Sequence, residues 1–532
     1  MSNRTFLLAI AVTLATSASA VFAQQSCENL TTLKLSGATV TSAATITAGP
    51  LAGPGAPGAA VNGPANAATT VPAHCEVKLT IHPSNDSEIK SAVWLPVAGW
   101  NGKYQQVGNG GWAGSIGYRA MVEPLIRGYA AAATDNGHEG GGGATWAIGH
   151  PEKLIDFGYR AVHETSVQAK AVIRAFYGRD PALSYFAGCS DGGREALMEA
   201  QRYPEDFNGI LAGAPASDWS HLFTGFVWNE QALLKSPGSS IPPAKLPAIQ
   251  NGVLATCDSQ DGLKDGLLSD PRTCRFDPAV LLCTDADGPN CLTAAQVDAL
   301  KAIYGGAKNP RTGEQIFPGW PAGAEAAPGT WATWITPANP AASAQANFGN
   351  TYYGQAVFED PKWDFRTLDF DRDVRYGDTK AGTVLNATNP DLRSFRAEGG
   401  KLLQYHGWGD AAISAVSSIE YYDSVQTFLS KFPDARSAAD RPIADFYRLF
   451  MVPGMGHCGG GAGPNSFDAF SALESWVEKG AAPAQLIGTG TLAGDSTKKM
   501  TRPICAYPEV ARYKGTGDPN DAANFMCAAP SR

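Results

Sequence analysis

The chain carries few charges and has no long basic run. Charged residues make up 17% of its 532 residues, and the formal net charge is −9. Because the binding of nucleic-acid phosphates needs a concentrated positive surface, this composition argues against a nucleic-acid partner. No CxxC pair occurs, which argues against a structural zinc site. The sequence also lacks an internal repeat.

The first residues are typical of an export signal. Arg4 precedes the apolar stretch 6–15, and two small-residue triplets, at 18–20 and 21–23, fit a cleavage site. We predict a signal peptide over residues 1–23. The alternative is a membrane anchor, but this apolar core is too short to span a bilayer, and no later segment is long and apolar enough. The mature protein is therefore expected to be secreted or periplasmic, without a membrane partner.

The ten cysteines form an even set, which in an exported chain implies disulfides rather than free thiols. Their number does not fix the connectivity. Short spacings suggest three local pairs, Cys257–Cys274, Cys283–Cys291 and Cys505–Cys527. The other four cysteines are Cys27, Cys75, Cys189 and Cys458.

Strand-like and helix-like segments alternate through two parts of the chain, which predicts a mostly parallel α/β sheet. Before it, residues 24–75 are rich in small residues, and 49–68 is predicted to be an exposed loop. The first alternating part has strands predicted at 76–82, 91–95, 103–107, 129–134, 183–187 and 209–213, with helices at 156–176 and 194–202. The second part has strands predicted at 402–406 and 447–452, with helices at 417–431 and 467–479.

Between these parts the alternation stops, and prolines and tryptophans become frequent. We interpret residues 218–389 as an inserted lid domain. Residues 24–217 and 390–532 then form one catalytic domain, with the α/β-hydrolase fold as the predicted fold class.

The motif Gly188-Cys189-Ser190-Asp191-Gly192 lies between a predicted strand and a predicted helix. This is the context of a nucleophile elbow, a tight turn that exposes the serine hydroxyl at the carboxyl edge of a sheet. The alternative is a glycine turn with an idle serine. The motif and its setting favour Ser190 as a nucleophile.

A serine hydroxyl is a weak nucleophile that needs a base, and the base needs an orienting acid. In this fold the partners follow in the order serine, acid, histidine. Asp410 comes directly after the predicted strand 402–406, whereas Asp423, Asp434 and Asp440 end no clear strand. Of the eight histidines only His457 follows Asp410. We therefore predict a triad of Ser190, Asp410 and His457, the alternatives being a turn aspartate and a surface histidine.

The oxyanion of an acyl-transfer intermediate needs preorganised N–H donors. We predict that one donor is the backbone N–H of Asp191, which follows the nucleophile, and that the other comes from Gly110 or Gly111. These two glycines lie in the run 108–111 after a predicted strand. The alternative is an ordinary flexible loop.

Cys189 precedes the predicted nucleophile and Cys458 follows the predicted base. Because the serine oxygen and the histidine nitrogen of a working triad lie ~3 Å apart, their chain neighbours are also close. A disulfide between Cys189 and Cys458 is geometrically reasonable, and a buried thiol at each position is the alternative.

Three motifs carry a resemblance to a known family: Cys-Ser-Asp-Gly-Gly-Arg at 189–194, His-Gly-Trp-Gly-Asp at 406–410 and Gly-Met-Gly-His-Cys at 454–458. The chain resembles the tannase and feruloyl esterase family, which includes mono(2-hydroxyethyl) terephthalate hydrolase. The resemblance extends over nearly the whole mature chain. It implies a Cys189–Cys458 disulfide, a lid domain and the hydrolysis of aromatic carboxylic esters.

The segment 257–267 holds three aspartates interleaved with glycines, a pattern that can offer carboxylate and carbonyl oxygens to a hard cation. It lacks the spacing and final glutamate of an EF-hand, and solvated turn aspartates are the alternative. The family resemblance implies structural Ca²⁺ in the lid. The implied ligands are the side chains of Asp258, Asp261 and Asp265 and the carbonyls of Leu263 and Leu267.

The inserted region is rich in aromatic residues that can either fill its core or line a pocket for a flat acyl group. They are Trp219, Trp228, Trp320, Trp331, Trp334, Tyr352, Tyr353 and Trp363. The expected substrate is a small aromatic ester of the hydroxycinnamoyl or feruloyl type. Galloyl esters and mono(2-hydroxyethyl) terephthalate are the alternatives within enzymes. An inactive module that binds phenolics or carbohydrates is the alternative from another class. The preferred ester and the oligomeric state stay open.

Overall fold

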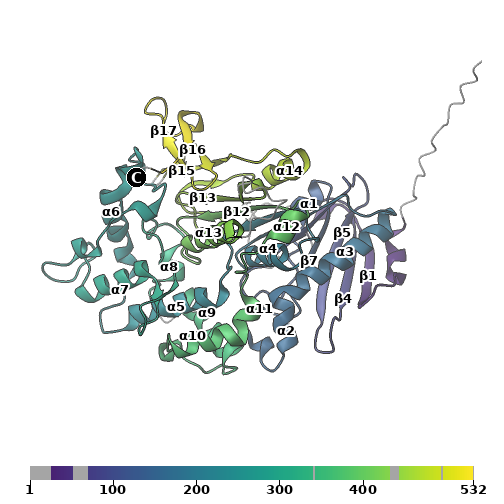
Figure 1. Cartoon of the computed structure of the whole chain (residues 1–532), viewed down its shortest axis with the longest axis horizontal. Helices are drawn as coiled ribbons and strands as arrows, with labels where there is room; N and C mark the ends of the chain where they lie inside the picture. Colours follow the sequence, from purple (N-terminus) through teal and green to yellow (C-terminus); the bar gives the residue numbers. More distant parts are fainter. Residues whose placement is uncertain (1–24, 52–69, 340–341, 432–442, 493–494, 531–532) are drawn as a thin grey trace, which may run out of the picture.

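The computed structural model describes residues 25–51, 70–339, 342–431, 443–492 and 495–530 (Figure 1). The predicted signal peptide and most of the predicted loop 49–68 lie outside these ranges. Within them, no helix combines the length and the apolar character that crossing a membrane requires.

A nine-stranded sheet forms the centre of the molecule, in the order β1-β4-β5-β7-β6-β8-β9-β12-β13. From β7 to β13 neighbouring strands are parallel, while β1, β4 and β5 pair antiparallel at one side. Parallel strands end at the same edge, so the loops that follow β6, β8, β12 and β13 meet there. The strands are β1 (Ala38–Ile46), β4 (His74–Ile81), β5 (Ile89–Pro96), β6 (Lys103–Val107), β7 (Ala130–Thr134), β8 (Leu183–Cys189), β9 (Gly209–Gly213), β12 (Lys401–Gly407) and β13 (Tyr447–Val452).

Helices cover both faces of this sheet because alternate strand residues are apolar on each face. On one face, buried side chains of α3 (Ala161–Tyr177), α4 (Asp191–Arg202) and α13 (Val416–Lys431) share a hydrophobic cluster with the strands. On the other face, α14 (Ala469–Lys479) packs Leu473 and Trp476 against the sheet, and α1 (Val122–Ile126) packs nearer the antiparallel side. Both faces are thus shielded from water, as a parallel sheet requires.

The chain between β9 and β12, here called the inserted region (residues 214–400), supplies most of a second hydrophobic core, which side chains from residues 112–157 and 411–413 complete. In Figure 1 these teal and green helices gather beside the sheet. The predicted limits 218 and 389 fall inside this stretch. Its elements are α5 (Trp219–Leu234), α6 (Leu246–Cys257), α7 (Ala294–Gly305), β10 (Ala307–Lys308), β11 (Gln315–Phe317), α8 (Trp331–Trp334), α9 (Ala344–Asn350), α10 (Arg372–Gly377), α11 (Thr383–Leu385) and α12 (Arg393–Ala397).

The C-terminal segment adds two small antiparallel sheets that the sequence analysis did not predict. They consist of β14 (Gly463–Ser466), β15 (Gln485–Leu492) and β16 (Asp495–Cys505), and of β17 (Val510–Tyr513) with β18 (Phe525–Ala528). Buried Leu486 and Ile504 pack with α14 on the sheet face. All ten cysteines are paired, the three short-range pairs being those that the spacing suggested.

Several element boundaries differ from the predictions, and the edge strand β1 was also missed. The helix predicted from 194 begins at Asp191, directly after the nucleophile. The segment predicted as one helix over 156–176 begins with a wide π turn over Asp156–Arg160, which continues α2 (Pro151–Ile155), and α3 starts at Ala161. Strand β1 is mostly exposed alanine and threonine and was missed, because such an edge strand lacks the apolar alternation that marks a half-buried one. Strand β1 pairs along β4. The 3-10 turn before β1 (Cys27–Thr32) is joined to β4 by the Cys27–Cys75 disulfide.

Candidate active site

Ser190 occupies the tight turn between β8 and α4 in a strained backbone conformation. Its φ of 67° and ψ of −120° lie in a region that non-glycine residues rarely adopt and that recurs at nucleophile elbows. The turn closes only because the residues two positions before and after Ser190, Gly188 and Gly192, lack side chains. A Cβ on Gly188 would lie 2.4 Å from the Gly192 carbonyl oxygen, and one on Gly192 would lie 2.8 Å from that of Asn109. The fold therefore holds the serine hydroxyl at the carboxyl edge of the sheet.

The structure brings the three predicted triad residues together. His457 Nε2 lies 2.9 Å from Ser190 Oγ, and His457 Nδ1 lies 2.7 Å from Asp410 Oδ2. Ser190 follows β8, Asp410 follows β12, and His457 lies in the loop after β13. Both distances are those of a base that hydrogen-bonds its nucleophile while a carboxylate orients the ring.

The carboxylate of Asp410 is fully buried and ionised. Its Oδ1 accepts hydrogen bonds from the backbone N–H groups of Ala412 and Ile413, at 2.8 and 2.9 Å. Burial alone would raise its pKa. The charge of His457, with hydrogen bonds from His406 and His457, outweighs burial, so the pKa of Asp410 lies well below its usual value. The site thus keeps a negative charge beside His457 in the absence of bulk water.

A disulfide joins the nucleophile turn to the histidine loop. Cys189 and Cys458 are bonded with their Cα atoms 6.0 Å apart, across 269 residues of sequence. Both are buried and pack around Ala214. This cross-link lies one residue from Ser190 and one residue from His457, so it restrains the two groups that exchange a proton.

The backbone N–H groups of Asp191, Gly110 and Gly111 have no hydrogen-bond acceptor within the described residues. The Gly192 N–H donates to the Asn109 carbonyl at 2.9 Å, which ties the glycine loop to the start of α4. Gly111 has a φ of +57°, which favours glycine, and a Cβ there would lie 3.3 Å from the Phe348 ring. These amides are therefore available to donate to an oxyanion, and their role as oxyanion donors stays a prediction.

Two buried residues of α4 brace this region. Arg194 pairs with the Asp191 carboxylate at 2.6 Å and donates to the carbonyls of residues 157 and 158. Glu195 accepts from the Asn109 N–H at 2.9 Å and from the Asn136 side chain at 2.7 Å. Burial, with the nearby Asp191 charge, raises the pKa of Glu195 to about 7. Helix α4, which follows the nucleophile, therefore also fixes the position of the glycine loop through the Glu195 hydrogen bond to Asn109.

Two aromatic side chains of the inserted region reach the active site. The Trp334 ring lies edge-on to the His457 ring at 5.5 Å between centroids, and it stacks with Phe348 at 6.0 Å. Both rings are partly exposed, whereas most of the other candidate aromatics are buried in the second core. Trp334 and Phe348 thus form an apolar wall beside the reactive groups.

The acidic segment 258–267 follows α6 and is closed by the Cys257–Cys274 disulfide. Burial and the charges of neighbouring aspartates raise the pKa values of Asp258 and Asp261. Arg502 Nη2 lies 2.7 Å from Asp265 Oδ2, yet this buried oxygen makes no hydrogen bond, so the approach is a charge contact with poor alignment. Backbone N–H groups and the Ser269 hydroxyl also donate to Asp258, Asp261 and Asp265, and a cluster of such oxygen donors fits a hard divalent cation.

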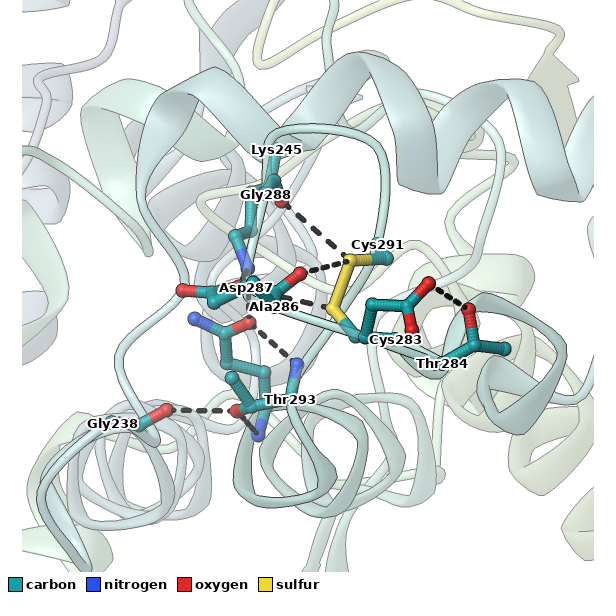
Figure 2. The surroundings of a disulfide bond; sticks show 11 residues. Gly238, Lys245, Cys283, Thr284, Ala286, Asp287, Gly288, Cys291 and Thr293 are labelled. Atoms are coloured by element: carbon teal, nitrogen blue, oxygen red, sulfur yellow. Dashed lines mark hydrogen bonds and ion pairs between the residues drawn. A yellow bond between two sulfur atoms is a disulfide. The ribbon is translucent and has the colours of Figure 1, made fainter.

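A tighter cluster of possible metal ligands than that of segment 258–267 lies elsewhere in the inserted region. Within the described ranges, one group of three possible metal-binding side chains has ligand atoms that all lie within 4.8 Å of one another. It consists of Cys283, Asp287 and Cys291 (Figure 2). The two sulfurs form a disulfide, and Lys245 pairs with Asp287. This group therefore lacks free thiolates and already has its counter-ion, and we assign it no metal. The three aspartates of 258–267 are spaced more widely.

Sequence reasoning missed several residues that the structure places at the site. His406 and Arg194 lie inside the quoted motifs, but no pattern showed what their side chains contact. Phe348 and Glu195 carried no motif signal beyond their residue type. Their roles depend on contacts between segments more than 80 residues apart.

Comparison with known proteins gives a consistent assignment. The family described as tannase and feruloyl esterase matches residues 75–528. An uncharacterized esterase of Xanthomonas campestris pv. campestris is 41% identical, over 96% of this chain and 92% of its own. A mono(2-hydroxyethyl) terephthalate hydrolase of Piscinibacter sakaiensis is 35% identical, over 87% and 86% of the two chains. The crystal structure of feruloyl esterase B from Aspergillus oryzae superposes with a TM-score of 0.81 at 29% identity, covering 94% of this chain and 99% of the other.

The cross-link beside the triad generates a prediction. Replacing Cys189 and Cys458 together by alanine should reduce ester turnover about a hundredfold, because a displacement near 1 Å costs about that much in rate. The far-ultraviolet circular dichroism should stay close to that of the wild type. Replacing Cys283 and Cys291 by alanine is the matched control and should leave turnover within about twofold. Full activity of the Cys189/Cys458 variant would contradict the restraining role.

Proposed function

The chain is an esterase of the tannase and feruloyl esterase family, and on this premise we propose that it is a secreted serine carboxylesterase acting on small aromatic esters. The observation that carries the proposal is the continuous hydrogen-bonded path from Ser190 Oγ through His457 to Asp410. This path supports nucleophilic acyl transfer, because it couples a hydroxyl to a base and an orienting charge.

In the proposed mechanism His457 Nε2 takes the proton of Ser190, whose oxygen attacks the ester carbonyl carbon. Asp410 holds the imidazole in the tautomer that leaves Nε2 free and stabilises the imidazolium. The N–H groups of Asp191 and of Gly110 or Gly111 stabilise the oxyanion. His457 then donates the proton to the leaving alcohol, which leaves an acyl-enzyme. Water then gives a proton to His457 while its oxygen attacks the acyl carbon; the bond from that carbon to Ser190 Oγ breaks, the acid leaves, and His457 returns the proton to Oγ.

An aromatic acyl group is supported by the wall of Trp334 and Phe348. A flat ring can stack on or meet the edges of these side chains, and such contacts are favourable beyond simple burial. Esters of the feruloyl type are therefore the proposed substrates. Galloyl esters and mono(2-hydroxyethyl) terephthalate are the alternative substrates, and the second is the ester in the name of the Piscinibacter sakaiensis relative.

We also propose that the inserted region binds a structural Ca²⁺. The ligands would be the carboxylates of Asp258, Asp261 and Asp265 with the carbonyls of Leu263 and Leu267. The support is their donor type and the burial and mutual repulsion that raise the pKa values of Asp258 and Asp261. When bound, the cation supplies positive charge that relieves carboxylate repulsion, and no step of the reaction uses it.

The five disulfides indicate an oxidising compartment. This fits the predicted export signal and supports a secreted or periplasmic location for the mature enzyme.

Removal of the nucleophile tests the mechanism. Ser190→Ala should lower kcat/KM by at least about a thousandfold, and combining it with His457→Ala should cost little more, because the residues act as one unit. Ser184→Ala, in the strand β8 that precedes the nucleophile, is the matched control and should keep its rate within about twofold. A serine-directed phosphonate should label the wild type at Ser190. A Ser190→Ala enzyme with a tenth of the wild-type rate would overturn the assignment, and a wild type that resists labelling would favour an inactive binding module.

Substrate preference is tested by a panel of methyl ferulate, methyl caffeate, methyl gallate and mono(2-hydroxyethyl) terephthalate. We expect the highest kcat/KM for a hydroxycinnamate ester. Trp334→Ala should raise KM for that ester about tenfold while the rate on a short aliphatic ester changes less, because only the aromatic acyl group contacts the indole. A higher kcat/KM on the gallate or terephthalate ester would replace the proposed substrate by that alternative.

Removal of calcium tests the structural cation. Exhaustive chelation, or Asp261→Asn, should lower Tm by several degrees, because a ligand bound by the folded state alone stabilises it by mass action. Turnover well below Tm should largely persist. Asp285→Asn, in the exposed loop between Cys283 and Cys291, is the control and should leave Tm unchanged. Protein without calcium by elemental analysis, and with the same Tm before and after chelation, would refute the site.

A further inference from the structure

A second imidazole touches the acid of the proposed triad. His406 lies near the end of β12, and its side chain is fully buried. Its Nε2 lies 3.2 Å from Asp410 Oδ2 and 3.1 Å from the Ile413 carbonyl oxygen. Its Nδ1 lies 2.7 Å from the hydroxyl of Ser418, on α13.

These partners determine which ring nitrogen carries the proton. The Ile413 carbonyl oxygen only accepts hydrogen bonds, and so does an ionised Asp410. His406 Nε2 must therefore bear a hydrogen and donate it between the two oxygens. In the neutral ring Nδ1 is then the acceptor, and the Ser418 hydroxyl donates to it.

The donation completes the hydrogen bonding of the Asp410 carboxylate. Oδ1 accepts from two backbone N–H groups, and Oδ2 accepts from both His457 Nδ1 and His406 Nε2. An ionised carboxylate offers about four lone-pair sites, so all of them are used. Rotation of the carboxylate would break bonds at both oxygens, and its orientation toward His457 is thereby fixed.

Two imidazole N–H donors, those of His406 and His457, also interact with the negative charge of Asp410. Among the described ionisable side chains, those that make hydrogen bonds to this carboxylate are His406 and His457. Loss of the His406 donor would leave the buried negative charge to interact with His457 alone. The imidazolium of His457 would then be favoured more strongly, and a protonated His457 cannot act as the base.

We propose that His406 is a positioning residue of the active site, which fixes the Asp410 carboxylate and moderates the charge that His457 experiences. The inference rests on the proposed function of the triad. It assigns to the histidine of the His-Gly-Trp-Gly-Asp motif a role that acts through Asp410 and involves no contact with substrate.

Two amide substitutions separate the two sides of the ring. The amide of His406→Gln reaches the position of Nε2 and keeps a donor to Asp410, while it gives up the bond to Ser418. The amide of His406→Asn reaches the position of Nδ1 and keeps a partner for Ser418, while it loses the donor to Asp410. The buried His74 lies on β4, and His74→Asn is the matched control for the loss of a buried imidazole.

We expect His406→Asn to lower kcat about tenfold to a hundredfold, to change KM by less than about threefold and to move the acid limb of the kcat/KM profile to higher pH. His406→Gln should recover most of kcat and return the acid limb toward the wild-type position. His74→Asn should match the wild type in both. Active sites are counted by phosphonate titration, so that loss of folded protein is not read as loss of rate.

Equal losses in both His406 variants, with an unmoved acid limb, would indicate a merely structural residue and overturn the proposal. A full kcat in His406→Asn would do the same. The low-field proton resonance of the His457 Nδ1–H, followed against pH, gives a readout without turnover. Its midpoint should move in His406→Asn and return in His406→Gln. If the wild type hydrolyses no ester, the proposed function fails, while this resonance still decides the role of His406.

Discussion

The contact between Ser190 Oγ and His457 Nε2 is the interaction on which the rest of the site depends, and a parallel sheet makes it possible. The nucleophile follows β8, the acid follows β12, and the base follows β13, all at one edge of the sheet. The strained turn at Ser190 persists because the surrounding structure over-determines it. The Gly192 N–H donates a hydrogen bond to the Asn109 carbonyl oxygen, and the Cys189–Cys458 disulfide links the nucleophile turn to the histidine loop.

A buried charge sets the second constraint. The Asp410 carboxylate sits where burial opposes ionisation, and an ionised group there persists only with donors on every side. Two backbone N–H groups from the turn after β12 and two imidazoles meet that need. Buried charged groups on α4 are hydrogen-bonded in the same way. Arg194 pairs with Asp191 and donates to backbone carbonyls, and Glu195 accepts from the N–H of Asn109 in the glycine loop. The reactive atoms are thus surrounded by groups whose own positions are fixed by hydrogen bonds.

The inserted region contributes shape more than chemistry. Most of its helices pack in a second core that also includes residues of 112–157 and 411–413, and its Trp334 ring contacts His457. The triad residues follow strands of the sheet, whereas the aromatic wall comes from the inserted region, so the wall can differ from that of a relative without a change in the catalytic groups. The family is shared with proteins whose names specify different esters, and this division of labour is consistent with that range.

The sequence by itself determined the elbow and the three local disulfides, because each depends on residues close together in the chain, and it determined the fold class and the order of serine, acid and histidine because these follow from a series of such local signals along the chain. Turn glycines, apolar alternation and short cysteine spacings are local signals that backbone sterics and burial dictate. Only the tertiary structure decided the Cys27–Cys75 pairing, the edge strand β1, the C-terminal sheets and the contacts of Phe348 and Glu195. A side chain's hydrogen-bond partner and the pairing of an exposed edge strand depend on which distant segments pack beside it. That packing is set by the whole core, which no single stretch of sequence contains.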